Sequence, residues 1–164
     1  MLTKPGGRRR TGPLALVSTL ARLTLAGVLL AAGGLKAADP QTAVQAVRAY
    51  QLLPASIEPL VGWGLPFLEI ALGLLLLVGL CTRPAAGASA VLLVVFIAAV
   101  LSAAARGLSI DCGCFGGGGT VAPGKTEYLH EILRDAALLA CAGWLVWHPS
   151  SLLSLDRATL EDRP

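Results

Sequence analysis

Charged residues are scarce in this sequence of 164 residues: only 14% are Asp, Glu, Lys or Arg, whereas 55% are hydrophobic. Soluble globular domains carry about 25% charged and about 45–50% apolar residues. Together with a mean hydropathy of +0.71, this scarcity excludes polar disorder and an ordinary cytosolic domain. The length allows one domain at most, and the sequence contains no internal repeat.

A strong charge of either sign is also lacking. Thirteen Lys and Arg stand against ten Asp and Glu, a net charge of +3, and the basic excess gathers near the N-terminus in Lys4 and Arg8–Arg10. Nucleic-acid-binding proteins instead present a basic face or stripe. The sequence therefore predicts no nucleic-acid partner, and the N-terminal cluster is better explained as a signal for membrane orientation.

Hydropathy divides the chain into four apolar segments, each long enough to cross a bilayer core of about 30 Å. They are residues 14–35, 60–80, 84–105 and 129–147. The predicted fold is an all-α integral membrane protein: a bundle of four transmembrane helices (14–147) between a basic cytoplasmic N-terminus (1–13) and a cytoplasmic tail (148–164). The first segment could instead be a secretory signal peptide, but its length and the Arg22 within it favour a retained helix.

Lys and Arg gather on the cytoplasmic side of membrane proteins and so indicate the orientation of the chain. With the N-terminus inside, the inner flanks (1–13, 81–83 and 148–164) hold seven of them, and the longer outer flanks (36–59 and 106–128) hold four. Both termini are therefore predicted to be cytoplasmic in a cell (inner or plasma) membrane. The loop 106–128 is then extracytoplasmic, where dithiols become oxidised.

Only two of the four cysteines are close in sequence. In the segment Asp111-Cys112-Gly113-Cys114 a single glycine separates the thiols, and Gly113 permits the sharp bend that ring closure needs. A ring this small is strained, and strained disulfides are labile and oxidising. The pair therefore predicts a reversible dithiol exposed at the outer surface, on a loop that Gly116–Gly119 makes free to approach a partner.

Two other interpretations of Cys112 and Cys114 stay open at this point. A static disulfide would pin the loop, although a bridge over one residue closes too short a loop to stabilise much. A metal site could take two soft ligands from the pair and a third from His130. Because the sequence offers no clear fourth ligand, no metal is predicted.

Three further ionisable residues are candidates because of where they lie in the sequence. Arg134, in the first turns of the segment 129–147, would favour the thiolate form of the cysteine pair if it lies nearby; the alternative is an interfacial charge that only pairs with its neighbours. Arg22 and Glu69 are charges within the membrane. Their distances from the inner helix ends differ by only about 4–5 Å at 1.5 Å per residue, so a structural pair is predicted rather than a proton or quinone role.

Motifs in a fixed order along residues 14–147 resemble the MauE branch of the MauE/DoxX group of redox-associated membrane proteins. They are Arg22, Gly34-Leu35-Lys36, Tyr50-Gln51-Leu52-Leu53-Pro54, Leu65-Pro66-Phe67-Leu68-Glu69, Ile110-Asp111-Cys112-Gly113-Cys114-Phe115-Gly116 and Leu133-Arg134-Asp135. The resemblance implies a four-helix membrane protein that helps to mature the β subunit of methylamine dehydrogenase, an exported protein rich in disulfides. DoxX relatives imply a different role, as small subunits of membrane electron-transfer complexes.

Two functions follow from these observations. In the first, the protein is a thiol–disulfide oxidoreductase component whose Cys112 and Cys114 exchange with an exported disulfide-containing protein or a thioredoxin-like partner through a mixed disulfide. Because the sequence lacks Cys-x-x-Cys and a second exposed cysteine pair, either a quinone accepts the electrons or the protein is a passive link; no other cofactor is predicted. In the second, the protein is a non-enzymatic assembly factor or a DoxX-like subunit, and the cysteines form a static clip.

Overall fold

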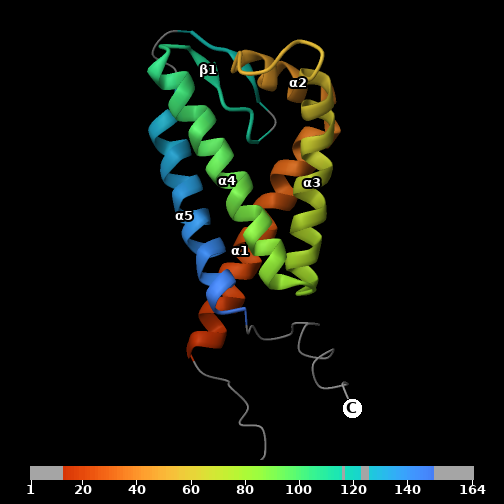
Figure 1. Cartoon of the computed structure of the whole chain (residues 1–164), viewed down its shortest axis with the longest axis vertical. Helices are drawn as coiled ribbons and strands as arrows, with labels where there is room; N and C mark the ends of the chain where they lie inside the picture. The colour runs from red at the N-terminus through yellow and green to blue at the C-terminus, as the bar shows by residue number, and fades with distance from the viewer. Residues whose placement is uncertain (1–12, 116, 123–125, 150–164) are drawn as a thin grey trace, which may run out of the picture.

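The computed structural model describes residues 13–115, 117–122 and 126–149 (Figure 1). These residues form α1 (Pro13–Ala38), α2 (Pro40–Ala49), α3 (Glu58–Val78), α4 (Thr82–Ala105), the strands β1 (Ile110–Asp111) and β2 (Gly119–Thr120), and α5 (Tyr128–Trp147). Each long helix begins and ends within three residues of a predicted apolar segment. Most of the N-terminal segment 1–13 and of the tail 148–164, both predicted to be cytoplasmic, lies outside the described residues.

The helices α1, α3, α4 and α5 run side by side along the long axis of the molecule, while α2 and the strands cover one end (Figure 1). Successive long helices run in opposite directions, so the start of α1 and the end of α5 lie at the end opposite the strands. α1 packs most closely on α3, and α4 on α5, whereas α3 and α4 contact each other sparingly.

Of the described helices, α1, α3 and α4 are long and apolar enough to cross a membrane, with mean hydropathies of 2.0, 2.0 and 2.6 over their most apolar stretches. Large apolar side chains such as Leu60 and Phe67 are exposed on their outer surfaces, as expected for helices that face lipid. These helices confirm the prediction of a helical membrane protein. The predicted fourth span does not meet the same criterion, because the 20-residue α5 carries Glu131, Arg134 and Asp135 in its first turns.

Glycines allow α1 and α3 to approach each other closely. A Cβ atom on Gly73 would lie 2.7 Å from Cγ of Leu30, and one on Gly33 would lie 2.8 Å from the carbonyl oxygen of Pro66. Neither position has room for a larger side chain. This is the small-residue packing that brings helices together where lipid surrounds them.

A second contact joins α1 to α5 near the end of the bundle that is opposite the strands. Ser18 Oγ donates a hydrogen bond to the carbonyl oxygen of His148 (3.0 Å) and accepts one from Nε1 of Trp144 (3.1 Å). The rings of Trp144 and His148 stack with their centroids 4.3 Å apart. The first and last helices of the bundle are thus joined by side-chain hydrogen bonds as well as by apolar packing.

The predicted pair between Arg22 and Glu69 is wrong. The buried Arg22 donates from Nη1 to the carbonyl oxygens of Leu76 (2.8 Å) and Leu77 (3.1 Å), in the last turn of α3. Glu69 instead accepts from Nζ of Lys36 (2.5 Å), and both of these residues are buried. The prediction compared the distances of Arg22 and Glu69 from the inner ends of their helices. It failed because these ends are not level: α1 begins well below the end of α3 (Figure 1). Arg22 is therefore level with carbonyl groups at the C-terminal end of α3, where the helix dipole places partial negative charge.

Candidate functional site

The loop between α4 and α5 folds as a small hairpin that carries the cysteine pair. β1 and β2 pair antiparallel, with Ile110 opposite Thr120. Tyr128, at the start of α5, holds the hairpin: its hydroxyl donates to the carbonyl oxygen of Leu108 (2.5 Å) and accepts from the backbone N–H of Ile110 (3.3 Å). This hairpin was not predicted, because strands of two residues are too short to show an alternating pattern.

Glycines let the turn of the hairpin lie directly against α2. Gly113 and Gly118 have φ angles of +69° and +145°, and a Cβ atom on either would lie 2.5 Å from Cβ of Ala46. A carboxylate oxygen of Asp111 accepts from the backbone N–H of Gly113 (3.0 Å) and holds the bend. Gly113 and Gly118 therefore serve close packing, whereas the sequence predicted that Gly116–Gly119 leaves the loop free; Gly116 lies outside the described residues.

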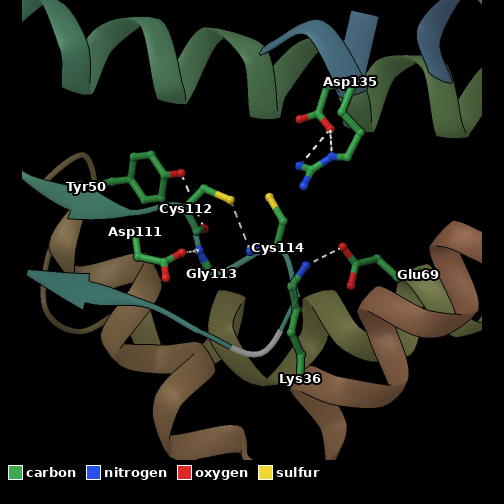
Figure 2. Close-up of polar contacts among 9 residues, drawn as sticks. Lys36, Tyr50, Glu69, Asp111, Cys112, Gly113, Cys114 and Asp135 are labelled. Carbon is green, nitrogen blue, oxygen red and sulfur yellow. Dashed lines mark hydrogen bonds and ion pairs between the residues drawn. The ribbon is translucent and has the colours of Figure 1, made fainter. Parts of the chain in front are cut away.

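The two cysteine side chains lie next to each other beside this turn (Figure 2). Both are thiols, and Cys112 Sγ accepts a hydrogen bond from the backbone N–H of Cys114 (3.3 Å). Cys114 is only 8% exposed, whereas Cys112 is half-buried, and its carbonyl oxygen accepts from the hydroxyl of Tyr50 (3.4 Å). The prediction of a dithiol exposed at the surface is therefore wrong for Cys114, and Cys112 is the more accessible thiol.

Two ion pairs flank Cys114. Lys36 and Glu69 lie on one side of it, and Asp135 lies on the other (Figure 2). Asp135 is paired with Arg134, whose Nη2 lies 2.9 Å from Oδ1 of the carboxylate. Arg134 and Cys114 line the same small cavity, together with both members of the Lys36–Glu69 pair. Two cations from different helices, α1 and α5, thus lie near the buried sulfur.

These contacts separate the proton affinities of the two thiols. The pKa of Cys114 is lowered, first by the hydrogen bond from the Cys112 thiol and then by the charges of Arg134 and Lys36, although burial opposes this. The pKa of Cys112 is raised because its thiol donates that hydrogen bond, because it is buried, and because a thiolate at Cys114 repels a second one. When the reduced pair loses a proton, the thiolate therefore forms at Cys114 and Cys112 keeps its proton.

We expect Arg134→Met to raise the pKa of Cys114, because it removes a cation near the thiolate. When the pH is lowered, Cys114 should become protonated and unreactive earlier in the variant, at a pH where Cys114 of the wild type still reacts. The measurement is the rate of alkylation of Cys114 by iodoacetamide across the pH range, read by mass spectrometry. Arg83→Met removes the same charge in the first turn of α4 and serves as the control. Identical pH profiles for Arg134→Met and wild type would contradict this role of Arg134.

Glu131 also belongs to the site. One of its carboxylate oxygens, a carboxylate oxygen of Asp111 and Sγ of Cys112 all lie within 4.8 Å of one another. Glu131 is buried, and its Oε2 has no hydrogen-bond partner within the described residues. By distance these three groups could hold a metal ion, but structural zinc takes four protein ligands. His130, the third ligand suggested by the sequence, is exposed and is not part of this group.

A cavity of about 210 Å³ lies against the cysteine loop. Its walls come from α1, α2, α3, α4 and the cysteine loop and are almost entirely apolar. The polar groups among the described lining residues include Lys36 of α1, Tyr50 and the two cysteines. Burial raises the pKa of Tyr50, so its side chain is a neutral hydroxyl. Sites for small molecules combine an apolar lining with a few polar groups in this way. The cavity is therefore a place where an apolar cofactor could be held.

Comparison with known proteins gives one match. The family model described as methylamine utilisation protein MauE matches residues 14–148, which include every long helix and the cysteine loop. Neither a curated protein nor a solved structure matches the chain.

Proposed function

Since the chain belongs to the MauE family, as its motifs predicted, we propose that it is a thiol–disulfide oxidoreductase component of the membrane. In this proposal, Cys112 and Cys114 exchange with an exported disulfide-containing protein, or with a thioredoxin-like partner, in methylamine utilisation. The observation that carries the proposal is the asymmetry of the pair, in which a buried Cys114 that favours the thiolate lies beside a more accessible Cys112.

This asymmetry suits exchange chemistry. When the pair is oxidised, the thiolate of a partner attacks Sγ of Cys112, forms a mixed disulfide and breaks the bond to Cys114. The leaving group is the thiolate of Cys114, and thiols of low pKa leave fastest. A second thiolate of the partner then attacks the mixed disulfide, which releases the oxidised partner and leaves Cys112 and Cys114 reduced.

The same proposal includes α5 as a fourth span and the cysteine loop on the extracytoplasmic side of the cell membrane. α5 runs along the bundle beside α4 (Figure 1). Its charged residues gather at the end that adjoins the cysteine loop, where Arg134 and Asp135 line a cavity with Cys114 instead of facing lipid. The distribution of Lys and Arg along the sequence supports this orientation, and the extracytoplasmic side supplies the oxidising conditions that a disulfide needs.

A second function, an assembly factor or DoxX-like subunit without exchange chemistry, is favoured by one observation. The turn of the hairpin packs tightly against Ala46, and Cys114 is buried, as the members of a static clip would be. The two functions differ in the state of the cysteines in growing cells. A clip is permanently oxidised, whereas an exchanging pair is found reduced, oxidised and linked to a partner.

The test is labelling with a membrane-impermeant maleimide in intact cells, using Cys81→Ser/Cys141→Ser protein, which keeps only the pair. We expect partial labelling of Cys112 that increases after mild reduction. A variant that keeps only Cys81, placed at the opposite end of the bundle, is the control and should react only after lysis. Labelling of the pair only after lysis would contradict the proposed orientation. A pair that is fully oxidised under every growth condition would favour the static clip.

A further inference from the structure

We propose that the cavity against the cysteine loop binds the ring of a membrane quinone, which accepts the electrons of Cys112 and Cys114. This inference rests on the proposed function, because it supplies the oxidant that an exchanging pair needs in order to turn over. The other cysteines are poorly placed to relay electrons. Cys81 precedes α4 at the opposite end of the bundle, and Cys141 lies ten residues beyond Glu131 along α5, a distance of about 15 Å.

The size and lining of the cavity suit a single substituted ring. An apolar cavity of about 150 Å³ is large enough to bind benzene, and this one measures about 210 Å³. Val47 of α2, Leu65 of α3 and Phe96 of α4 supply apolar contacts from three helices, and Cys112 and Cys114 form part of the wall. A ring held there would lie beside the two residues that lose the electrons.

The cavity opens toward the surface that faces lipid. Leu52, Leu53 and Val95 line it and are also 37–56% exposed on the outside of the protein. α3 and α4 form this side and contact each other sparingly, in contrast to the tight packing of α1 on α3. A ligand with an isoprenoid tail therefore has an apolar path from the bilayer, whereas a polar oxidant would lose its hydration on entry.

Two polar groups on the wall can donate hydrogen bonds to the oxygen atoms of a quinone. The ammonium group of Lys36 has three N–H donors and gives one to Glu69. It also lies 5.2 Å from the centre of the Phe96 ring. Within the described residues, the hydroxyl of Tyr50 makes one long hydrogen bond, 3.4 Å, to the carbonyl oxygen of Cys112. A fixed cation beside a quinone oxygen stabilises the negative charge that develops there as the ring is reduced.

The reaction balances in electrons and protons. The Cys114 thiolate and the Cys112 thiol lose two electrons as the bond between their Sγ atoms forms, and the quinone gains both electrons. One quinone oxygen takes the proton of the Cys112 thiol, and the other takes a proton from water. The products are the disulfide and an uncharged quinol, which returns to the bilayer.

The test uses the full chain, reduced and freed of reductant, in lipid nanodiscs without oxygen. Ala99→Trp fills the cavity, and Ala98→Trp, its matched control, places the same side chain one residue away, at an exposed position outside the lining. We expect wild type and Ala98→Trp to reduce a short-chain ubiquinone with loss of the two thiols. Ala99→Trp should do so at least about tenfold more slowly. Val47→Trp fills the same cavity from α2, so the conclusion does not depend on the folding of one variant.

A second measurement detects binding without chemistry. The ubiquinone should raise the Tm of Cys112→Ser/Cys114→Ser protein, and Ala99→Trp should remove this increase. If a saturated fatty acid raises the Tm as much as the ubiquinone does, the cavity is a site for lipid chains and the quinone proposal fails.

Oxidised glutathione, a water-soluble disulfide, tests the proposed function separately. If it oxidises the two thiols and the ubiquinone does not, the quinone site is contradicted while the exchange function stands. Equal reduction of ubiquinone by Ala98→Trp and by both cavity-filling variants would also contradict the site. If neither oxidant reacts with the thiols, both the proposed function and the quinone site fail.

Discussion

A Cys114→Ser variant is expected to lose thiol–disulfide exchange by about a thousandfold or more, because a serine hydroxyl replaces the thiolate that attacks and leaves. The same variant should accumulate a mixed disulfide between Cys112 and a partner. Cys112 is the more accessible thiol, so it can still attack a disulfide of the partner and form a mixed disulfide. Without Cys114, only the partner's own second thiol can resolve this adduct, by reversing the step that formed it. The adducts would be measured on non-reducing gels of acid-quenched cells and identified by mass spectrometry.

Two single substitutions serve as controls for this experiment. Cys112→Ser keeps a thiol that is only 8% exposed, so it should lose exchange equally but trap far less partner. Cys141→Ser removes a thiol from α5 away from the loop and should behave like the wild type. Equal trapping by Cys112→Ser and Cys114→Ser would show that Cys112 is not the thiol that faces the partner.

Glu69→Leu is expected to lower the free energy of unfolding by about 3–5 kcal/mol, the cost of removing one member of a buried ion pair. Lys36 and Glu69 are only 6% and 1% exposed, and their charged atoms lie 2.5 Å apart. The leucine leaves the ammonium group of Lys36 buried without its carboxylate. Thermal or chemical unfolding of the purified protein in detergent would measure the loss.

The double variant Lys36→Met/Glu69→Leu should recover most of this stability, because an apolar pair of similar volume replaces the ion pair. Arg48→Met provides a matched control in a different ion pair. Arg48 lies 2.8 Å from Glu58 but is 62% exposed, so its loss should cost only about 0–1 kcal/mol. A double variant as unstable as Glu69→Leu alone would show that the unpaired charge is not the cause.

The sequence was sufficient to locate the long helices, because a bilayer requires about 20 apolar residues in a row and such runs are visible without any structure. It was also sufficient to identify the cysteine pair, since two thiols separated by one residue are neighbours in any fold. Arg134 could be predicted as a nearby cation because it follows the loop within two turns of α5.

The relative heights of helices and the directions of side chains could not be predicted in this way. Lys36 was assigned to an outer flank by its position, yet it lies in the last turn of α1. Helical side chains lean toward the N-terminus, so Lys36 reaches back into the bundle to Glu69. Glu131 likewise approaches Asp111 only because the hairpin folds over the start of α5. A glycine-rich loop has no hydrophobic periodicity from which such a fold could be predicted.

The hydrogen bonds of Ser18 with Trp144 and His148 join residues 126 and 130 positions apart, so they form only after the last helix has been made. During synthesis, α1, α3 and α4 leave the ribosome first and are apolar enough to enter the membrane unaided. α5, with its charged first turns, is the helix least suited to insert alone. The last helix to be made is therefore the one that covers the faces of α1 and α4 against which it packs.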